Sequence, residues 1–136
     1  MDRYRPPLDD IRFSLAHEVP LTRLTAEPAL AVADPDTVGG LLEEAGRFAA
    51  EVIAPTDRVG DREGARLVDG GVVLPEAFRT AYAQYVASGW GAVQHPEAYG
   101  GGGFPLLVAT AVKELITTAN MAFSLGPLLT TGAVHL

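Results

Sequence analysis

The chain has 136 residues, of which 48% are apolar, and this supports one hydrophobic core and argues against a second domain. Ten basic and seventeen acidic residues give a net charge of −7 without a basic cluster, so nucleic-acid binding is disfavoured. The absence of cysteine excludes disulfides, thiolate nucleophiles and cysteine-based metal sites.

Other composition features argue against a metal site, a secretory signal and a membrane span. His17, His95 and His135 are too far apart in the sequence to form a helical pair of metal ligands. The amino-terminal arginines are not followed by an apolar segment of the secretory type, so we expect a cytoplasmic protein. The apolar stretches fall short of the roughly 20 residues that a membrane-spanning helix requires.

Residues 1–33 are predicted to form an amino-terminal arm with one short helix, interrupted at Pro20. Phe13 lies off the apolar stripe of this helix, so the face is either broad or lies against a second surface, as a tether between domains or subunits would. The stripe itself has apolar residues at spacings of three to five, namely Leu8, Ile11, Leu15, Val19 and Leu24.

The clearest predicted helix begins at Asp34-Pro35-Asp36, because an acidic cap followed by proline is typical of a helix amino-terminus. From Val38 to Ile53 apolar residues recur at three and four, which is the period of an amphipathic helix. Pro55 is expected to end this helix at about Ala54, because proline restricts the residue before it.

Residues 55–75 are rich in glycine and other turn formers, and they are predicted to form a long connector. Connectors longer than about 12 to 15 residues without structure of their own are uncommon. We therefore expect this one to pack against the rest of the domain or to hold a short hairpin at Asp69-Gly70.

A second helix is predicted from Glu76 to Ser88, with Gly89 as its carboxy-terminal cap. The glycine run after Tyr99 lacks the Lys-Ser/Thr ending of a phosphate-binding loop, so we interpret it as a turn that passes close to a ligand or another backbone. His95 and Glu97 are interpreted as structural or solvent-exposed residues, since no nucleophile lies near them in the sequence.

The last part of the chain is predicted to form a core helix at Leu106–Ile116 and a further helix at Thr117–Leu136, kinked at Gly126-Pro127. Small residues in the last helix fit two interpretations, a narrow apolar tunnel for a ligand or ordinary helix packing. The predicted fold class is all-α, a four-to-six-helix orthogonal or up-down bundle with a long glycine-rich connector.

Several strings, in order, resemble the amino-terminal region of acyl-CoA dehydrogenases. They are closest in pattern to the larger subgroup that includes long-chain and 3-methylmercaptopropionyl-CoA dehydrogenases. Any one string is weak evidence, but their order and separation are specific. The strings are FSLAHEV, LLEEAGRFAAEVIAPTDRVGDREGARLVDGGVVLPEAF, SGWGAV, HPEAYGGGG and ELITTANMAFSLGPLLTTGA.

This resemblance implies that residues 34–136 form the amino-terminal helical domain of an FAD-dependent enzyme that converts acyl-CoA thioesters into trans-2-enoyl-CoA. In that family a middle β-domain and a carboxy-terminal helical bundle bind FAD. The flavin signature T-E-P-x-A-G-S-D and the segment with the catalytic glutamate do not occur in this sequence. We therefore expect a truncated chain that is inactive alone, with no catalytic, cofactor-binding or metal-binding residues and no FAD held by this chain alone.

The resemblance also predicts substrate-binding residues on the glycine loop and on the last helix, where they would form a wall of the acyl pocket. The expected partners are acyl-CoA, the remaining domains or a partner subunit, and further copies in a homo- or hetero-oligomer. The alternative function is a non-catalytic helical binding or assembly module that retains the fold. The predicted substrate-binding residues are Tyr99, Gly101, Gly102, Asn120, Phe123, Pro127 and Leu128.

Overall fold

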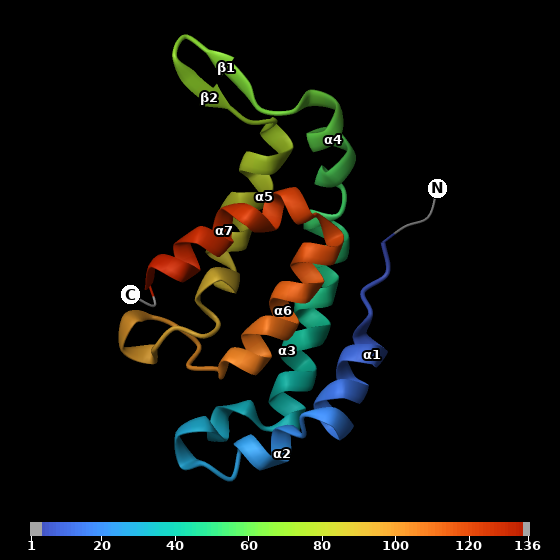
Figure 1. Ribbon diagram of the computed structural model, residues 1–136, viewed down its shortest axis with the longest axis vertical. Helices are drawn as coiled ribbons and strands as arrows, with labels where there is room; N and C mark the ends of the chain where they lie inside the picture. The colour runs from blue at the N-terminus through green and yellow to red at the C-terminus, as the bar shows by residue number, and fades with distance from the viewer. Residues whose placement is uncertain (1–3, 135–136) are drawn as a thin grey trace.

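Helices α3 (Pro35–Phe48) and α6 (Leu106–Ala119) lie side by side at the centre of the molecule and run in the same direction (Figure 1). The computed structural model describes residues 4–134. His135, one of the three histidines, and Leu136, the predicted end of the last helix, both lie outside this range. The prediction of a mainly helical domain is confirmed.

The hydrophobic core forms between these two helices and the turn that extends α3. Its largest fully buried side chains are each less than 2% exposed, and burying one such side chain contributes about 1.5–3 kcal/mol. The core is therefore built from residues far apart in the sequence: Val38, Leu42, Ile53, Val108 and Leu115.

The predicted limits of the helix that begins at Asp34 are confirmed. The Asp34 side chain accepts hydrogen bonds from the backbone N–H groups of Asp36 at 3.1 Å and Thr37 at 3.0 Å, so it caps α3. After Phe48 the helix widens into a π-helical turn, Ala49–Ile53, and it ends before Pro55.

The amino-terminal arm folds onto the core. It contains α1 (Leu8–Phe13), a π-helical turn (Ser14–Glu18), α2 (Leu21–Leu24) and a 3-10 helix (Pro28–Ala33), so the predicted interruption at Pro20 is correct. The Tyr4 hydroxyl donates a hydrogen bond of 3.0 Å to the Leu115 carbonyl, which ties the arm to α6. The role of the arm as a tether to another domain or subunit stays a prediction.

The connector is more ordered than the sequence predicted. Pro55 is followed directly by α4 (Thr56–Glu63), because proline is tolerated at the start of a helix. Gly60 had been interpreted as a turn residue, but it lies within α4, where an added Cβ would be 2.7 Å from the Phe78 ring. Its small size therefore serves close packing.

The expected hairpin at Asp69-Gly70 is present. Strands β1 (Arg66–Val68) and β2 (Gly71–Val73) pair antiparallel, with Leu67 opposite Val72. Asp69 has a φ of 48° and Gly70 a φ of 78°, and positive φ at both central residues is what a tight two-residue hairpin turn requires.

The described residues contain seven α-helices rather than four to six, since α2 and α4 were not expected. Helix α5 (Glu76–Ala87) ends at Gly89, which has a φ of 75° and confirms the predicted cap. Two 3-10 turns, Trp90–Ala92 and Glu97–Tyr99, precede α6.

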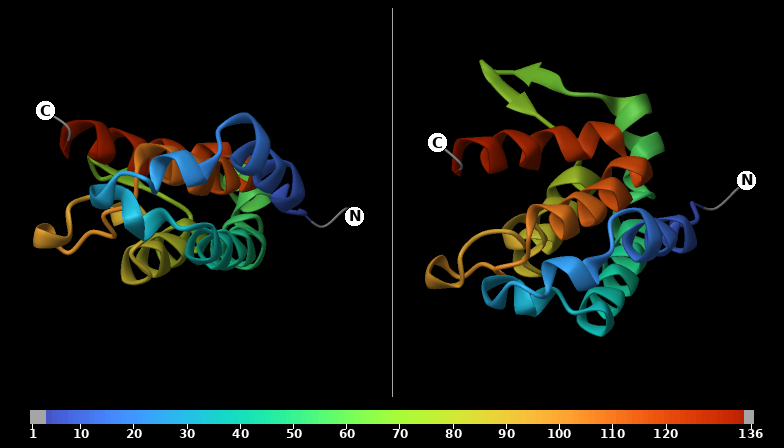
Figure 2. Two further views of the ribbon diagram at one scale, coloured as in Figure 1. Left: turned by 90° about the horizontal axis from the view of Figure 1, so that it is seen from below. Right: turned by 60° about the horizontal axis from the view of Figure 1, so that its bottom comes forward.

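The last two helices meet at a sharper break than predicted. Helix α6 continues to Ala119, Asn120 is extended with a φ of −160°, and α7 (Met121–Val134) then begins. Pro127 lies inside α7. Figure 2 shows α7 crossing α6 and running below the hairpin.

Replacing Asp34 tests the cap of α3. Hydrogen bonds that the Asp34 carboxylate accepts from Thr37, first from its side chain and then from its backbone N–H, lower the pKa of Asp34 in the folded chain. The cap therefore contributes stability above the pKa of the unfolded chain and loses that contribution as pH falls through the folded pKa. We expect Asp34→Ala to lower the melting temperature at neutral pH by a few degrees, and the difference to shrink in acid.

Asp34→Asn is the matched control, because its side-chain oxygen accepts the same hydrogen bonds but does not titrate. Its melting temperature relative to Asp34→Ala should not depend on pH between neutral and acid. Thermal unfolding followed by circular dichroism measures both differences. A constant gap between Asp34→Ala and the original chain at every pH would contradict the assignment.

Candidate functional site

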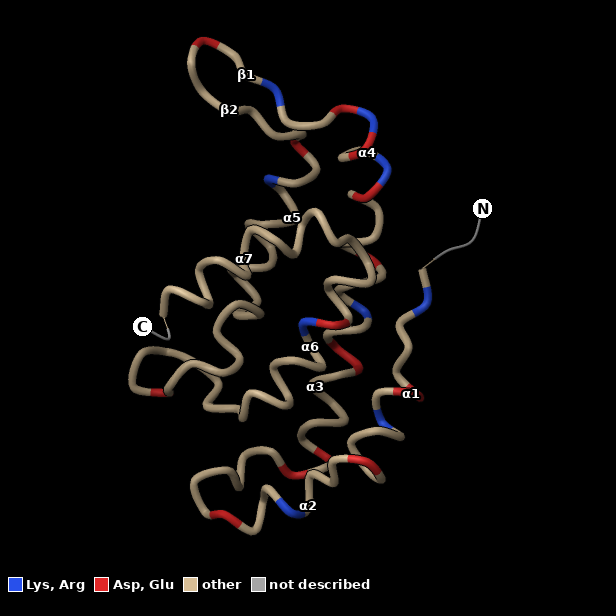
Figure 3. Tube along the Cα trace, viewed as in Figure 1, with Lys and Arg blue, Asp and Glu red and all other residues tan. Residues whose placement is uncertain are grey.

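Helix α7 is apolar but only partly covered. It carries no charged residue (Figure 3), and among its described residues only Phe123 and Ser124 are buried. Leu129 is 76% exposed and Leu125 is 54% exposed. Large contiguous apolar surfaces of this kind mark interaction or binding sites.

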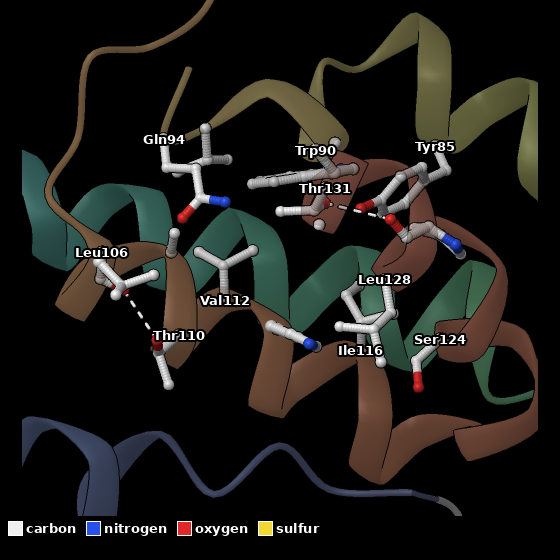
Figure 4. A pocket seen from close by; sticks show the side chains of 16 residues that line it. Tyr85, Trp90, Gln94, Leu106, Thr110, Val112, Ile116, Ser124, Leu128 and Thr131 are labelled. Carbon is white, nitrogen blue, oxygen red and sulfur yellow. Dashed lines mark hydrogen bonds between the residues drawn. The ribbon is translucent and has the colours of Figure 1, made fainter. Parts of the chain in front are cut away.

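A pocket of about 340 Å³ lies between α6, α7 and the segment from the end of α5 to Gln94. Figure 4 shows the Trp90 ring on one side of it, with Val112 and Ile116 from α6 facing that ring. The Trp90 ring also packs on Phe48 of α3, at 5.8 Å between ring centroids. The pocket is large enough for a small-molecule group, since ligand sites start at roughly 300 Å³.

The serine and threonine hydroxyl groups of the lining donate hydrogen bonds within their own helices. Thr110 donates to the Leu106 carbonyl at 2.8 Å, Ser124 to Met121 at 2.8 Å and Thr131 to Pro127 at 3.1 Å. These bonds reduce the polarity of a wall that is mainly apolar but also includes the polar side chains of Tyr85 and Gln94. The lining has one charged side chain, Lys113 of α6.

Tyr85 closes one end of the pocket with its ring. Burial, with a smaller contribution from the neighbouring Tyr82, raises the pKa of Tyr85 above its ordinary value. Its hydroxyl is therefore protonated at neutral pH. The pocket can hold an apolar chain, but none of its lining side chains is a carboxylate that could act as a general base.

The structure separates the predicted substrate-binding residues into four groups. Pro127 and Leu128 line the pocket. Phe123 is 5% exposed and lies in an aromatic cluster, with its ring centroid 5.8 Å from that of Tyr85 and 6.1 Å from that of Phe78. Whether any of these residues contacts a substrate stays a prediction.

Asn120 is buried at the junction of α6 and α7, where it has a clear structural role. Its side-chain NH₂ donates to the Thr56 hydroxyl at 2.8 Å, and that hydroxyl donates to the Ile53 carbonyl at 2.6 Å. Its side-chain oxygen accepts the Phe123 N–H at 3.1 Å, so Asn120 also caps α7. Asn120 does not line the pocket.

The glycine loop lies apart from the pocket lining. Tyr99 is 87% exposed, and the N–H groups of Gly101, Gly102 and Gly103 donate to the carbonyls of Pro96, Ala92 and His95, respectively. An added Cβ at Gly101 would be 2.0 Å from the His95 oxygen. These glycines allow the loop to pack on itself, which is one of the two interpretations of the run.

The glycine loop does not fit the pyrophosphate of a flavin cofactor. Binding of a pyrophosphate requires free backbone N–H groups, and those of the glycine run are bonded within the loop. In residues 4–134 no group of three or more acidic or histidine side chains is placed to hold a metal ion. No described helix has both the length and the apolar character needed to cross a membrane.

The sequence analysis missed Tyr85, Trp90, Val112 and Ile116 as pocket residues. Their apolar character was visible in the sequence, but it is equally typical of core residues. Only the crossing of α7 over α6 brings them opposite Pro127 and Leu128.

Removal of the Asn120 side chain should destabilise the fold. Asn120→Ala leaves the Phe123 N–H without its bond and removes the donor to Thr56, and loss of such buried bonds costs about 1–3 kcal/mol. Urea unfolding measures the loss. The exposed Thr110→Ala is the control, with an expected change within about 0.5 kcal/mol. Equal stability of both variants would show that the junction does not depend on Asn120.

Substitution of Gly101 should disturb the glycine loop. Gly101→Ala forces its Cβ against the His95 oxygen, and overpacking of this kind typically costs about 1–3 kcal/mol. Gly126→Ala is the matched control, because its Cβ would meet no atom within 4 Å. Limited proteolysis should cut Gly101→Ala faster within residues 95–104, and equal cutting of the two variants would contradict the packing.

Comparison with known proteins agrees with the fold and with the strings in the sequence. Residues 36–136 match the family described as the acyl-CoA dehydrogenase N-terminal domain. The 3-methylmercaptopropionyl-CoA dehydrogenase of Ruegeria pomeroyi is 44% identical over 131 residues, which are 96% of this chain and 22% of that protein. The chain thus spans about a fifth of the length of this curated relative. The chain belongs to the acyl-CoA dehydrogenase family, of which it contains the amino-terminal domain.

Proposed function

We propose that this chain forms one wall of the acyl pocket in an FAD-dependent acyl-CoA dehydrogenase. The observation that carries the proposal is the apolar pocket of about 340 Å³ between α6 and α7. Its wall includes Pro127 and Leu128, two of the residues that the family resemblance assigned to the substrate. The serine and threonine hydroxyl groups of the wall are bonded to their own helices, and most of the remaining lining is apolar, so the wall favours a hydrocarbon chain over a polar group.

In this proposal the chain contributes binding energy, and the chemistry takes place on polypeptide outside it. Burial of an acyl chain contributes about 0.8 kcal/mol per CH₂ group, so the depth of the pocket selects the chain length. FAD and the proton-abstracting glutamate belong to other parts of the complete enzyme, which acts in the cytoplasm on acyl-CoA thioesters. We therefore assign no catalytic or cofactor-binding residue to this chain.

The exposed side of α7 supports a contact with the remaining domains. Met121 is 66% exposed and Leu129 76% exposed on a helix without charge. In the complete enzyme the other domains would cover these side chains and close the open side of the pocket. The same surface suits a non-catalytic assembly module, and the two functions differ in whether the pocket distinguishes acyl chains.

Trp90 provides a direct measurement of acyl binding, because it is the only tryptophan of the chain and lines the pocket. Titration with acyl-CoAs of increasing length should change its fluorescence. The affinity should rise up to about fourfold per CH₂ group until the pocket is full. Coenzyme A without an acyl group should have little effect. In a dye-reduction assay the chain alone should show no turnover.

Two variants of α7 make this test specific. Leu128→Asp places a charge in the pocket wall and should weaken binding of long acyl-CoAs by at least about tenfold. Leu129→Asp is the matched control, since Leu129 is more exposed and does not line the pocket. An affinity that does not depend on acyl length would favour the assembly module. Turnover by the chain alone would contradict the proposal that the chemistry takes place outside this chain.

A further inference from the structure

A second hollow, which we call the hairpin groove, lies between the base of the hairpin, α4, α5 and the first half of α7. Its volume is about 480 Å³, and it shares only Pro127 with the proposed acyl pocket. Phe78 and Phe123 contribute aromatic surface to it. Small residues leave the space open: Gly60, Gly64, Ala65, Ala122 and Gly126.

The hairpin itself extends away from the helices (Figures 1 and 2). Leu67 is 76% exposed and Val72 is 72% exposed, and the two are directly opposite each other in the ladder, so they share one face. An isolated two-stranded hairpin is at best marginally stable in water. Its unpaired edges and apolar face are features that proteins normally cover.

We propose that two copies of this chain form a dimer in which the hairpin of each copy fills the hairpin groove of the other. The groove begins at the base of its own hairpin, where Gly64, Ala65, Leu74 and Pro75 line it. In the proposed dimer a two-fold axis lies beside this base, so that each hairpin extends over the groove of the other copy. Such reciprocal contacts are the usual form of a symmetric dimer interface.

The charges of the two surfaces are complementary. The only charged side chain in the groove lining is Arg79, and the turn of the hairpin carries Asp69. Within its own chain Arg79 pairs with Glu76 at 3.4 Å, but both side chains are more than two-thirds exposed, so this ion pair is weak. Arg79 is therefore available to Asp69 of the second copy.

The distribution of charge also favours this end of the molecule for self-association. Residues 55–79 contain four arginines and five acidic residues, whereas the rest of the chain has six basic and twelve acidic residues. Two copies therefore repel each other elsewhere, and they meet at the lowest electrostatic cost at the hairpin end (Figure 3).

Charge reversal tests the pairing. Sedimentation equilibrium of the chain should show a monomer–dimer equilibrium. Asp69→Arg and Arg79→Asp, each alone, should raise the dissociation constant about two- to fivefold. Mixing the two single variants should restore the original affinity, because both ion pairs of the mixed dimer are then complementary. A monomer at all concentrations, or no recovery on mixing, would overturn the proposal.

The apolar contact is tested by a substitution that should leave the fold intact. Val72 is exposed, so Val72→Asp should keep the circular dichroism spectrum while it raises the dissociation constant at least about tenfold. Leu129→Asp, on the part of α7 outside the groove, should not change the dissociation constant. The reverse pattern would show that the copies associate through α7 instead.

Cross-linking locates the contact, since the chain has no cysteine of its own. A Val72→Cys chain mixed with an Ala122→Cys chain should form a mixed disulfide under mild oxidation, identified by mass spectrometry. Ala26→Cys is the control, because Ala26 is exposed in the amino-terminal arm, outside the groove. Equal cross-linking of Val72→Cys to either variant would reject docking in the groove.

Discussion

The buried hydrogen bond between Asn120 and Thr56 fixes the start of α7, and α7 lines both the proposed acyl pocket and the hairpin groove. The bond joins residues 64 positions apart. The Thr56 hydroxyl in turn donates a hydrogen bond to the Ile53 carbonyl at the end of the α3 extension. Since the Asn120 side chain also caps α7, one residue both ends α6 and starts the next helix. An unsatisfied polar group at this buried position would be costly, which makes the crossing of α6 and α7 specific.

The aromatic cluster separates the proposed acyl pocket from the hairpin groove. Phe123 of α7 lies against Tyr85, which lines the pocket, and against Phe78 and Tyr82, which line the groove. The rings are tilted or edge-on toward Phe123, an arrangement that aromatic pairs favour. The cluster therefore fixes the position of α7. In our proposals the side chains on the two sides of the cluster bind different partners.

Two of the exposed apolar surfaces, on α7 and on the hairpin, have different neighbours in our proposals. The outer face of α7 is uncharged and suits the remaining domains of an acyl-CoA dehydrogenase. The hairpin lies within residues 55–79, where basic and acidic residues are nearly equal in number, and it suits a contact with a second copy of the chain. One small core can support both surfaces because α3 and α6 already provide a well-packed centre that neither contact needs to complete.

The sequence by itself determined the family, the mainly helical fold and most of the helix limits. Asp34, Pro55 and Gly89 act on the backbone within a few residues of themselves, so their caps and stops were predictable, as was the turn at Asp69-Gly70. Asn120 was selected from the sequence as a substrate residue, whereas the structure gives it a hydrogen-bonded place in the fold.

Only the tertiary structure decided which apolar residues face a pocket and which fill the core. It also decided that Gly60 belongs to a helix, because the Phe78 ring lies where a larger side chain would be. Trp90 and Ile116 come together through the crossing of α7 over α6, a contact between distant segments that no local pattern records. Helix ends follow from nearby residues, whereas a pocket depends on side chains brought together from distant parts of the chain.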